Sequence, residues 1–197
     1  MGNNKPIRRI AIIGTGVVGA SWAALFLAKG LEVVATDVAP NAELSLKGFI
    51  DAAWPALTRL GLSPGASQAN LKFTTALADA VKSVDLVQEN GPERIDFKKT
   101  LYGQLDEQLP PDVIIASSSS GLTMSEIQSG CRRHPERCVI AHPFNPPHLI
   151  QSPRRRSGRY RAFLPAVHRS YDGLVESSRL APVDARTPAE AHRGRSS

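Results

Sequence analysis

Three glycines in a fixed pattern stand between an apolar run and a helix-like segment near the start of the chain. Gly14, Gly16 and Gly19 directly follow a continuously apolar run, and a second apolar run, 31–36, ends at Asp37. A short, wholly apolar run is typical of a parallel strand buried on both faces. Strand, glycine turn, helix, strand and acid within about 30 residues favour a βαβ unit that binds a dinucleotide.

The glycines have separate physical uses in such a unit. Gly14 permits the tight turn, Gly16 lets a pyrophosphate approach the backbone, and Gly19 lets the helix pack close to the strand. The free N–H groups where the helix begins attract phosphates. We therefore predict a cofactor-binding turn made of Gly14, Thr15, Gly16, Val17, Val18 and Gly19.

Asp37 indicates which dinucleotide this is. It lies 18 residues after Gly19, where a carboxylate accepts hydrogen bonds from a ribose diol. An acid there repels a 2′-phosphate, so we expect NAD rather than NADP as the cofactor. The alternative is a glycine turn in a βα unit that binds no dinucleotide.

Strand-like and helix-like segments alternate over the rest of the first 150 residues, which predicts an α/β fold with a doubly wound parallel sheet. Ligands of such sheets bind beyond the carboxyl ends of the strands. We expect further strands at 71–74, 84–89, 113–117 and 138–142, and helices at 20–29, 39–60 with a break near Pro55, 76–82 and 92–108. The polar residues expected at strand ends are Asp37, Glu89, Ser117 to Ser120 and His142.

Residues 7–150 resemble the NAD-binding domain of the L-3-hydroxyacyl-CoA dehydrogenase family, which includes L-carnitine dehydrogenase, L-gulonate dehydrogenase and lambda-crystallin. The serine run and the His-Pro-Phe-Asn-Pro form are closer to the carnitine, gulonate and lambda-crystallin branch. Four blocks carry the resemblance: the glycine turn with Asp37, Gln88 to Arg94 through Lys98, Ser117 to Leu122, and His142 to Pro147.

The resemblance implies a Rossmann-type domain at 1–150 and NAD-dependent oxidation of a 3-hydroxyacyl-CoA or a small polar 3-hydroxy acid. By the same resemblance Glu93 and Lys98 lie near the nicotinamide, and Ser120 binds the reacting oxygen of the substrate. His142 aligns with the general base, and Asn145 either contacts substrate or holds its turn.

The chemistry of these residue types agrees with that reading. Oxidation of a secondary alcohol needs a proton acceptor beside the O–H and a hydride acceptor beside the C–H. Histidine titrates in the right range to accept the proton, and a serine hydroxyl fixes the position of the oxygen. The alternatives are a structural histidine at a strand end and a serine run that is only a flexible linker.

The last 47 residues have a different composition. Residues 151–197 hold 10 Arg, no Lys and 4 acidic residues, whereas residues 1–150 hold 14 basic and 14 acidic residues. The family resemblance stops near Ile150, and Arg154 stands where the family has the glutamate that orients the base. A cation there opposes protonation of the base. We interpret 151–197 as an irregular, disordered tail from out-of-frame translation, in place of the helical substrate and dimerisation domain.

This tail leaves several functions open. The chain is an impaired dehydrogenase, a non-catalytic NAD-binding module, or an enzyme completed by a separate chain. A role of the tail at nucleic acid or a membrane surface is disfavoured because lysine and interleaved aromatic residues are lacking, so we expect neither partner.

We expect a cytoplasmic protein because no signal-peptide core is seen. Cys131 and Cys138 match no zinc or CxxC spacing, so we expect free thiols and no metal.

Overall fold

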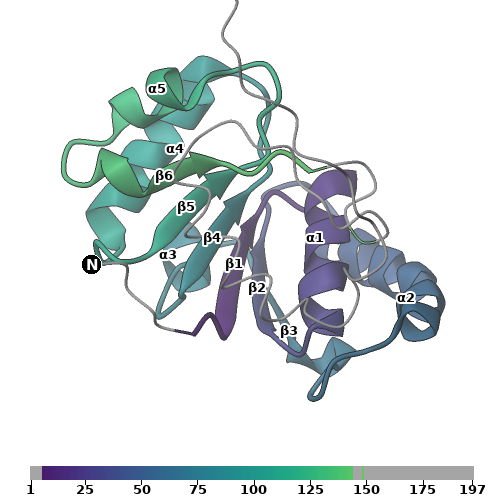
Figure 1. The fold of residues 1–197 in the computed structure, drawn as a ribbon. Helices are drawn as coiled ribbons and strands as arrows, with labels where there is room; N and C mark the ends of the chain where they lie inside the picture. Colours follow the sequence, from purple (N-terminus) through teal and green to yellow (C-terminus); the bar gives the residue numbers. More distant parts are fainter. Residues whose placement is uncertain (1–5, 144–147, 149–197) are drawn as a thin grey trace, which may run out of the picture.

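The computed structural model describes residues 6–143 and His148. Their strands form one six-stranded parallel sheet in the order β3-β2-β1-β4-β5-β6 (Figure 1). This is the order of doubly wound dinucleotide-binding sheets. The strands are β1 (Arg9–Ile13), β2 (Glu32–Thr36), β3 (Leu71–Thr74), β4 (Leu86–Glu89), β5 (Ile114–Ser117) and β6 (Cys138–Ile140).

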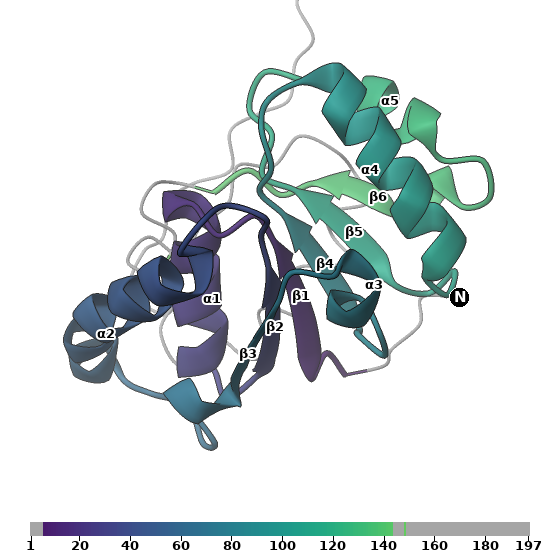
Figure 2. The same cartoon turned by 180° about the vertical axis from the view of Figure 1, so that it is seen from behind.

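Helices cover both faces of the sheet. Helices α1 and α2 lie on one side of the sheet, and α3, α4 and α5 lie on the other side (Figure 1 and Figure 2). The helices are α1 (Val17–Ala28), α2 (Ala42–Leu60), α3 (Leu77–Ala80), α4 (Ile95–Gln108) and α5 (Met124–Ile127), with 3-10 turns η1 (Gln68–Asn70), η2 (Gln128–Gly130) and η3 (Pro135–Arg137).

Strand β1 shows why its sequence is continuously apolar. Ile10 and Ile12 pack with α1 and α2, whereas Ala11 and Ile13 pack with α4 on the opposite face. Successive side chains of a strand point to opposite faces, so a strand covered on both sides needs apolar residues throughout. Helix α1 is equally enclosed, since every residue from Gly19 to Ala28 is buried.

The doubly wound parallel sheet predicted from the sequence is confirmed, but the helix boundaries needed correction. The expected break near Pro55 is wrong, because α2 runs without interruption from Ala42 to Leu60. Pro55 and Asp51 are both exposed, so water can solvate the Asp51 carbonyl that a proline nitrogen cannot pair. The helix expected from Pro92 begins at Ile95.

One helix was missed from the sequence although it has a recognisable start signal. Thr123 and Glu126 form a reciprocal capping box at the start of α5: the Thr123 hydroxyl accepts from the Glu126 N–H, while the Glu126 carboxylate accepts from Thr123. The Thr-x-x-Glu spacing is readable in the sequence. The tail predicted at 151–197 lies outside the described residues.

The polar residues that follow the strands lie at one edge of the sheet. Ile13 pairs with Thr36 and with Glu89, and Ser117 pairs with Glu89 and with Ile140. The loops that follow β1, β2, β4, β5 and β6 therefore all leave from the carboxyl edge. Within the described part of the chain, no helix is long and apolar enough to cross a bilayer.

Candidate functional site

The turn between β1 and α1 is built around close backbone contacts. Gly14 has φ +82°, which L side chains rarely adopt, and its N–H donates to the Thr36 carbonyl at 2.9 Å. A Cβ on Gly19 would stand 1.9 Å from the Gly14 carbonyl oxygen. A Cβ on Gly16 would meet nothing within 4 Å. Gly16 thus opens space at the N-terminus of α1, where N–H groups without helical partners attract phosphate oxygens.

Asp37 follows β2 and is hydrogen-bonded to the glycine turn. Its Oδ2 accepts from the Thr15 N–H at 2.7 Å and from the Thr15 hydroxyl at 3.0 Å, and Oδ1 accepts from the Ala39 N–H at 2.9 Å. Burial raises the pKa of Asp37, but the hydrogen bonds from Thr15, Ala39 and Val38 outweigh it, so the pKa lies below its usual value. The carboxylate is therefore ionised at neutral pH.

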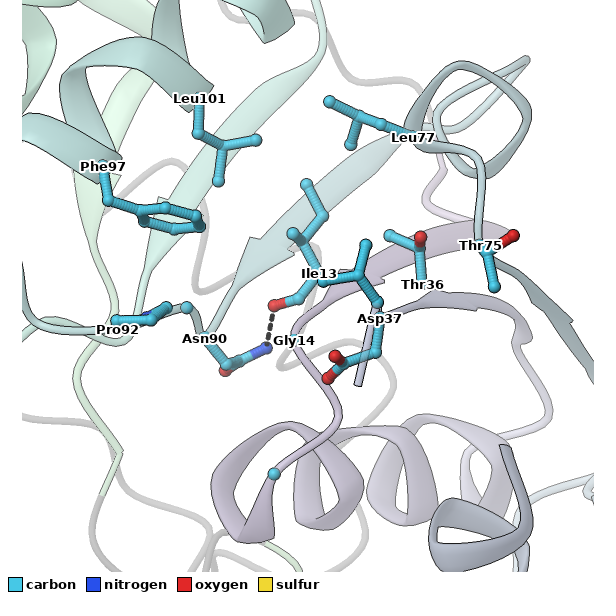
Figure 3. Close-up of a pocket in the computed structure, with 13 residues that line it drawn as sticks. Ile13, Gly14, Thr36, Asp37, Thr75, Leu77, Asn90, Pro92, Phe97 and Leu101 are labelled. Atoms are coloured by element: carbon cyan, nitrogen blue, oxygen red, sulfur yellow. Dashed lines mark hydrogen bonds between the residues drawn. The ribbon is translucent and has the colours of Figure 1, made fainter. Parts of the chain in front are cut away.

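A cavity of about 520 Å³ opens between the ends of β1, β2 and β4 (Figure 3). Asp37 lies at its edge beside Gly14, while apolar side chains from α3 and α4 form the opposite wall. The residues present fit a dinucleotide: an open glycine for a pyrophosphate, an ionised acid for a diol and an apolar slot for a flat ring. The wall from α3 and α4 consists of Leu77, Phe97 and Leu101, and Ile13 and Val38 add further apolar lining from β1 and the loop after β2.

A buried ion pair stands behind this cavity. Lys98 is 1% exposed and its Nζ lies 2.8 Å from each carboxylate oxygen of Glu89, which is 0% exposed. Glu89 also accepts from the Ser117 hydroxyl at 2.7 Å and from the Gly91 N–H at 2.6 Å. The sequence predicted Lys98 beside the cofactor; its contacts among the described residues are to Glu89, the Gly91 carbonyl and Glu93.

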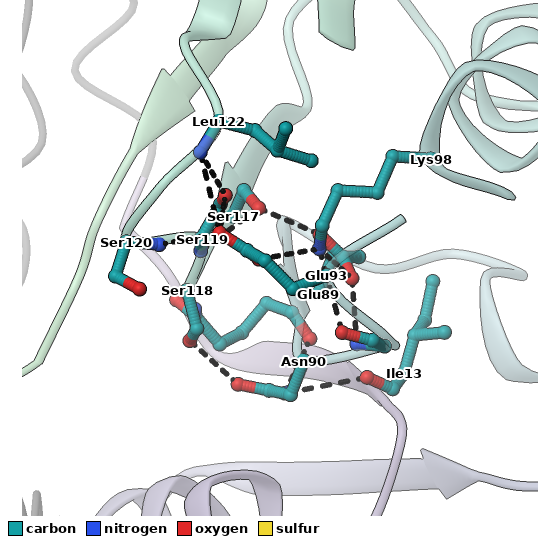
Figure 4. A network of polar contacts seen from close by, with 12 residues as sticks. Ile13, Glu89, Asn90, Glu93, Lys98, Ser117, Ser118, Ser119, Ser120 and Leu122 are labelled. Carbon is teal, nitrogen blue, oxygen red and sulfur yellow. Dashed lines mark hydrogen bonds and ion pairs between the residues drawn. The ribbon is translucent and has the colours of Figure 1, made fainter. Parts of the chain in front are cut away.

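Glu93 joins the loop after β4 to the serine loop after β5 (Figure 4). One of its oxygens, Oε1, accepts from the Ser119 hydroxyl at 2.6 Å and from the N–H groups of Ser120, Gly121 and Leu122 at 2.7–3.3 Å. Burial raises the pKa of Glu93, but these hydrogen bonds together lower it below its usual value. The serine run is therefore an ordered loop that encloses a carboxylate, and the linker alternative is wrong.

Ser118 is the centre of a second polar network. Its hydroxyl accepts from Trp22 Nε1 at 3.2 Å and from Gln88 Nε2 at 2.8 Å, and donates to Asn90 Oδ1 at 2.7 Å. Its carbonyl lies 2.9 Å from His142 Nδ1. A carbonyl oxygen only accepts, so Nδ1 carries the proton in this contact. The neutral ring then keeps an unprotonated Nε2, which is the form a general base needs.

The predicted catalytic residues have different surroundings. His142 is half-buried after β6, and Ser120 is exposed after β5, the neighbouring strand. Among the described residues, the backbone N–H of Ser120 donates to Glu93, and no hydrogen bond of its hydroxyl is seen there. Val17 is 63% exposed where α1 begins, whereas Val18 packs against the core of that face. The prediction for Asn145 falls on a residue outside the described part.

Sequence reasoning missed the apolar wall of the cavity and the role of Trp22. Leu77, Phe97 and Leu101 are ordinary apolar positions of two predicted helices, and nothing in their spacing indicates a shared cavity. Asn90 lines the same cavity and accepts a hydrogen bond from Ser118. Its position directly after β4, at a strand end, is the one sequence signal that could have identified it.

Comparison with known proteins identifies a family that matches this chain. The family model described as "3-hydroxyacyl-CoA dehydrogenase, NAD binding domain" matches residues 9–152. An L-carnitine dehydrogenase of Nocardiopsis dassonvillei is 51% identical over 146 residues, which cover 74% of this chain and 44% of that protein. An L-carnitine dehydrogenase of Bacillus cereus is 41% identical over 192 residues, 98% of this chain and 58% of that protein. The chain spans about half the length of the curated relatives it matches.

Solved structures give the same picture. The crystal structure of the NAD+-dependent dismutase 5-formyl-3-hydroxy-2-methylpyridine 4-carboxylic acid 5-dehydrogenase is similar with a TM-score of 0.73 and 37% identity, over 83% of this chain and 55% of that one. A 3-hydroxybutyryl-CoA dehydrogenase from Escherichia coli is similar with a TM-score of 0.64 and 27% identity, over 72% of this chain and 30% of that one.

Proposed function

Because this chain belongs to the 3-hydroxyacyl-CoA dehydrogenase family through its NAD-binding domain, with NAD as the cofactor, we propose that it derives from an enzyme that oxidises the 3-hydroxyl carbon of a small polar hydroxy acid. The observation that carries the oxidoreductase assignment is the family match over residues 9–152, and the contact of His142 Nδ1 with the Ser118 carbonyl supports His142 as the base. The relatives named L-carnitine dehydrogenase favour a carnitine-like substrate over a 3-hydroxyacyl-CoA.

The residues that would hold NAD come from the glycine turn, the loop after β2 and helix α4. The N–H groups after Gly16 would bind the pyrophosphate, Asp37 would accept from the adenosine ribose diol, and the apolar wall with Phe97 would pack against the adenine. When bound, the nicotinamide supplies the hydride acceptor. Glu93 and Lys98 would support the nicotinamide end, Glu93 by fixing the serine loop through its hydrogen bonds and Lys98 through its ion pairs with Glu89 and Glu93.

The proton chemistry is assigned to His142 and Ser120. Nε2 of His142 accepts the proton of the substrate hydroxyl, while the Ser118 carbonyl holds the ring through Nδ1. Ser120 binds the substrate oxygen through its exposed hydroxyl, and Asn145 contacts the substrate or holds its turn. A backbone carbonyl stabilises an imidazolium less than a carboxylate does, and Arg154 stands where the family has that carboxylate.

We therefore propose that the chain by itself binds NAD and turns over little. Calorimetric titration with NAD and NADH-absorbance assays with L-carnitine, L-gulonate and 3-hydroxybutyryl-CoA test this together. Measurable NAD binding with turnover more than tenfold below a full-length relative supports it. Turnover within tenfold of the relative would contradict impairment, and absence of NAD binding would contradict the cofactor site.

The second candidate is a non-catalytic NAD-binding module, because the matching family model is that of an NAD-binding domain and the glycine turn with Asp37 needs no catalytic residue to bind the cofactor. Reading the gene from codon 130 past the stop in all three frames separates the two. A shifted frame that continues into a Pro-Leu-Val-(Asp or Glu)-Val strand supports an impaired dehydrogenase. Its absence favours the module.

A further inference from the structure

The two cysteines of the chain stand side by side on the α4 face of the sheet. Cys131 follows the turn η2, and Cys138 is the first residue of β6. Their Sγ atoms are 3.7 Å apart and the residues are 9% and 6% exposed. The chain contains no other cysteine. Any disulfide formed within these 197 residues must therefore join these two.

The loop between the cysteines is anchored, so the fold sets the separation of the sulfurs. Asp106 of α4 accepts from the backbone N–H groups of Arg132, Arg133 and His134 at 2.6–3.0 Å. Arg137 donates to the Asp106 carboxylate at 2.9 Å. Asp106 is 1% exposed, and water therefore competes weakly for these hydrogen bonds. Both flanks of the loop are tied to the same carboxylate.

The remaining separation is small. A disulfide bond is about 2.0 Å long, so the sulfurs must approach by roughly 1.7 Å, a displacement that side-chain rotation divides between two residues. The contact between the two thiols lowers the pKa of one and raises that of the other, burial raises the pKa of both, and the charge of Arg137 lowers the pKa of both. Exchange with a disulfide reagent starts from whichever thiol is deprotonated first.

We propose that Cys131 and Cys138 form an oxidisable dithiol, a modification site that a small disulfide such as glutathione disulfide converts to an intramolecular disulfide. The thiolate of one cysteine attacks one sulfur of the reagent, which forms a mixed disulfide and releases one small thiolate. The other cysteine gives its proton to a base such as that thiolate, attacks the protein sulfur of the mixed disulfide and releases the second small thiol. The protein loses two electrons and two protons, and both end on the released thiols.

The test compares the folded and the unfolded chain. The full-length protein is equilibrated with mixtures of glutathione and glutathione disulfide, in native buffer and in concentrated urea. It is then acid-quenched, alkylated and weighed intact, so that each free thiol gains one alkyl group and the disulfide gains none. We expect the equilibrium constant for the disulfide to be at least about tenfold larger in native buffer, because the anchored loop holds the sulfurs together. An equal or smaller constant in native buffer would overturn the proposal.

Peptide mapping identifies the product. Trypsin separates the two cysteines into peptides 100–132 and 138–154, which remain joined only through the disulfide. Cys138→Ser is the matched control and should yield only a glutathione adduct on Cys131. A disulfide-linked dimer as the main wild-type product, or a stable glutathione adduct without the internal bond, would also contradict the proposal. No NAD is present in this test, so its outcome is independent of the proposed function.

Discussion

Replacing each of three glycines by alanine separates the needs of the fold from those of the cofactor. At Gly16 the new methyl group would meet nothing within 4 Å, and φ is −60°, which alanine adopts readily. Gly16 is the N-cap of α1, where alanine is a poorer residue, so we expect a loss of unfolding free energy of about 1 kcal/mol at most. The open space that the methyl fills is the space proposed for the pyrophosphate.

The expected effect of Gly16→Ala on binding is much larger than its effect on stability. Displacing the phosphates by one methyl radius lengthens at least one charge-assisted hydrogen bond, a loss of about 1.5–3 kcal/mol. That loss weakens NAD binding by about 10- to 150-fold, which calorimetric titration measures directly. NAD affinity within twofold of the wild type would refute the placement of the pyrophosphate at this turn.

Gly19→Ala and Gly48→Ala are the controls. The Gly19 methyl would stand 1.9 Å from a backbone oxygen, so α1 must shift, and we expect a loss of about 1–3 kcal/mol in urea unfolding. Gly48 is exposed within α2, and a Cβ there would meet nothing within 4 Å. Alanine at this position should raise the free energy of unfolding by about 0.5–1 kcal/mol, because it is a better helix former than glycine. A Gly19→Ala protein as stable as the wild type would show that the close helix contact is not required.

Three further changes test the charged groups. Asp37→Ala removes the acceptor for the ribose diol and should weaken NAD binding, measured by calorimetry, by about tenfold. The same change should reduce the ratio of NAD affinity to NADP affinity. An unchanged NAD affinity would refute the diol contact. Lys98→Met leaves the buried Glu89 carboxylate uncompensated and should cost about 3–5 kcal/mol of unfolding free energy, and a cost below 1 kcal/mol would contradict the buried pair. Burial raises the pKa of Asp106, but hydrogen bonds from the backbone and from Arg137 lower this pKa below its usual value. The ionised Asp106 therefore stabilises the fold above about pH 4, and this stabilisation is lost as the pH falls further. The difference in unfolding free energy between wild type and Asp106→Asn should therefore be largest at neutral pH and shrink in acid, and a pH-independent difference would contradict this.

The sequence by itself determined the parts of this protein that depend on neighbours along the chain. The glycine turn, the apolar run before it and Asp37 lie within about one βαβ unit, so local spacing predicts both the parallel sheet and the dinucleotide. The strand order then follows from the usual winding of such sheets. The position of Pro55 was misread because propensity does not show which helix face meets water.

Only the tertiary structure decided which distant groups meet. Glu93 accepts hydrogen bonds from the serine loop 26–29 residues further along, and Asp106 accepts from residues 26–31 positions beyond it. The proximity of Cys131 and Cys138 follows from the same anchoring of the loop between them. These contacts depend on strand register and on which side chains share a face, and periodicity along the chain leaves both undetermined. The physical reason is that a buried charge is stabilised by whichever donors the packing brings to it, and sequence spacing does not record those donors.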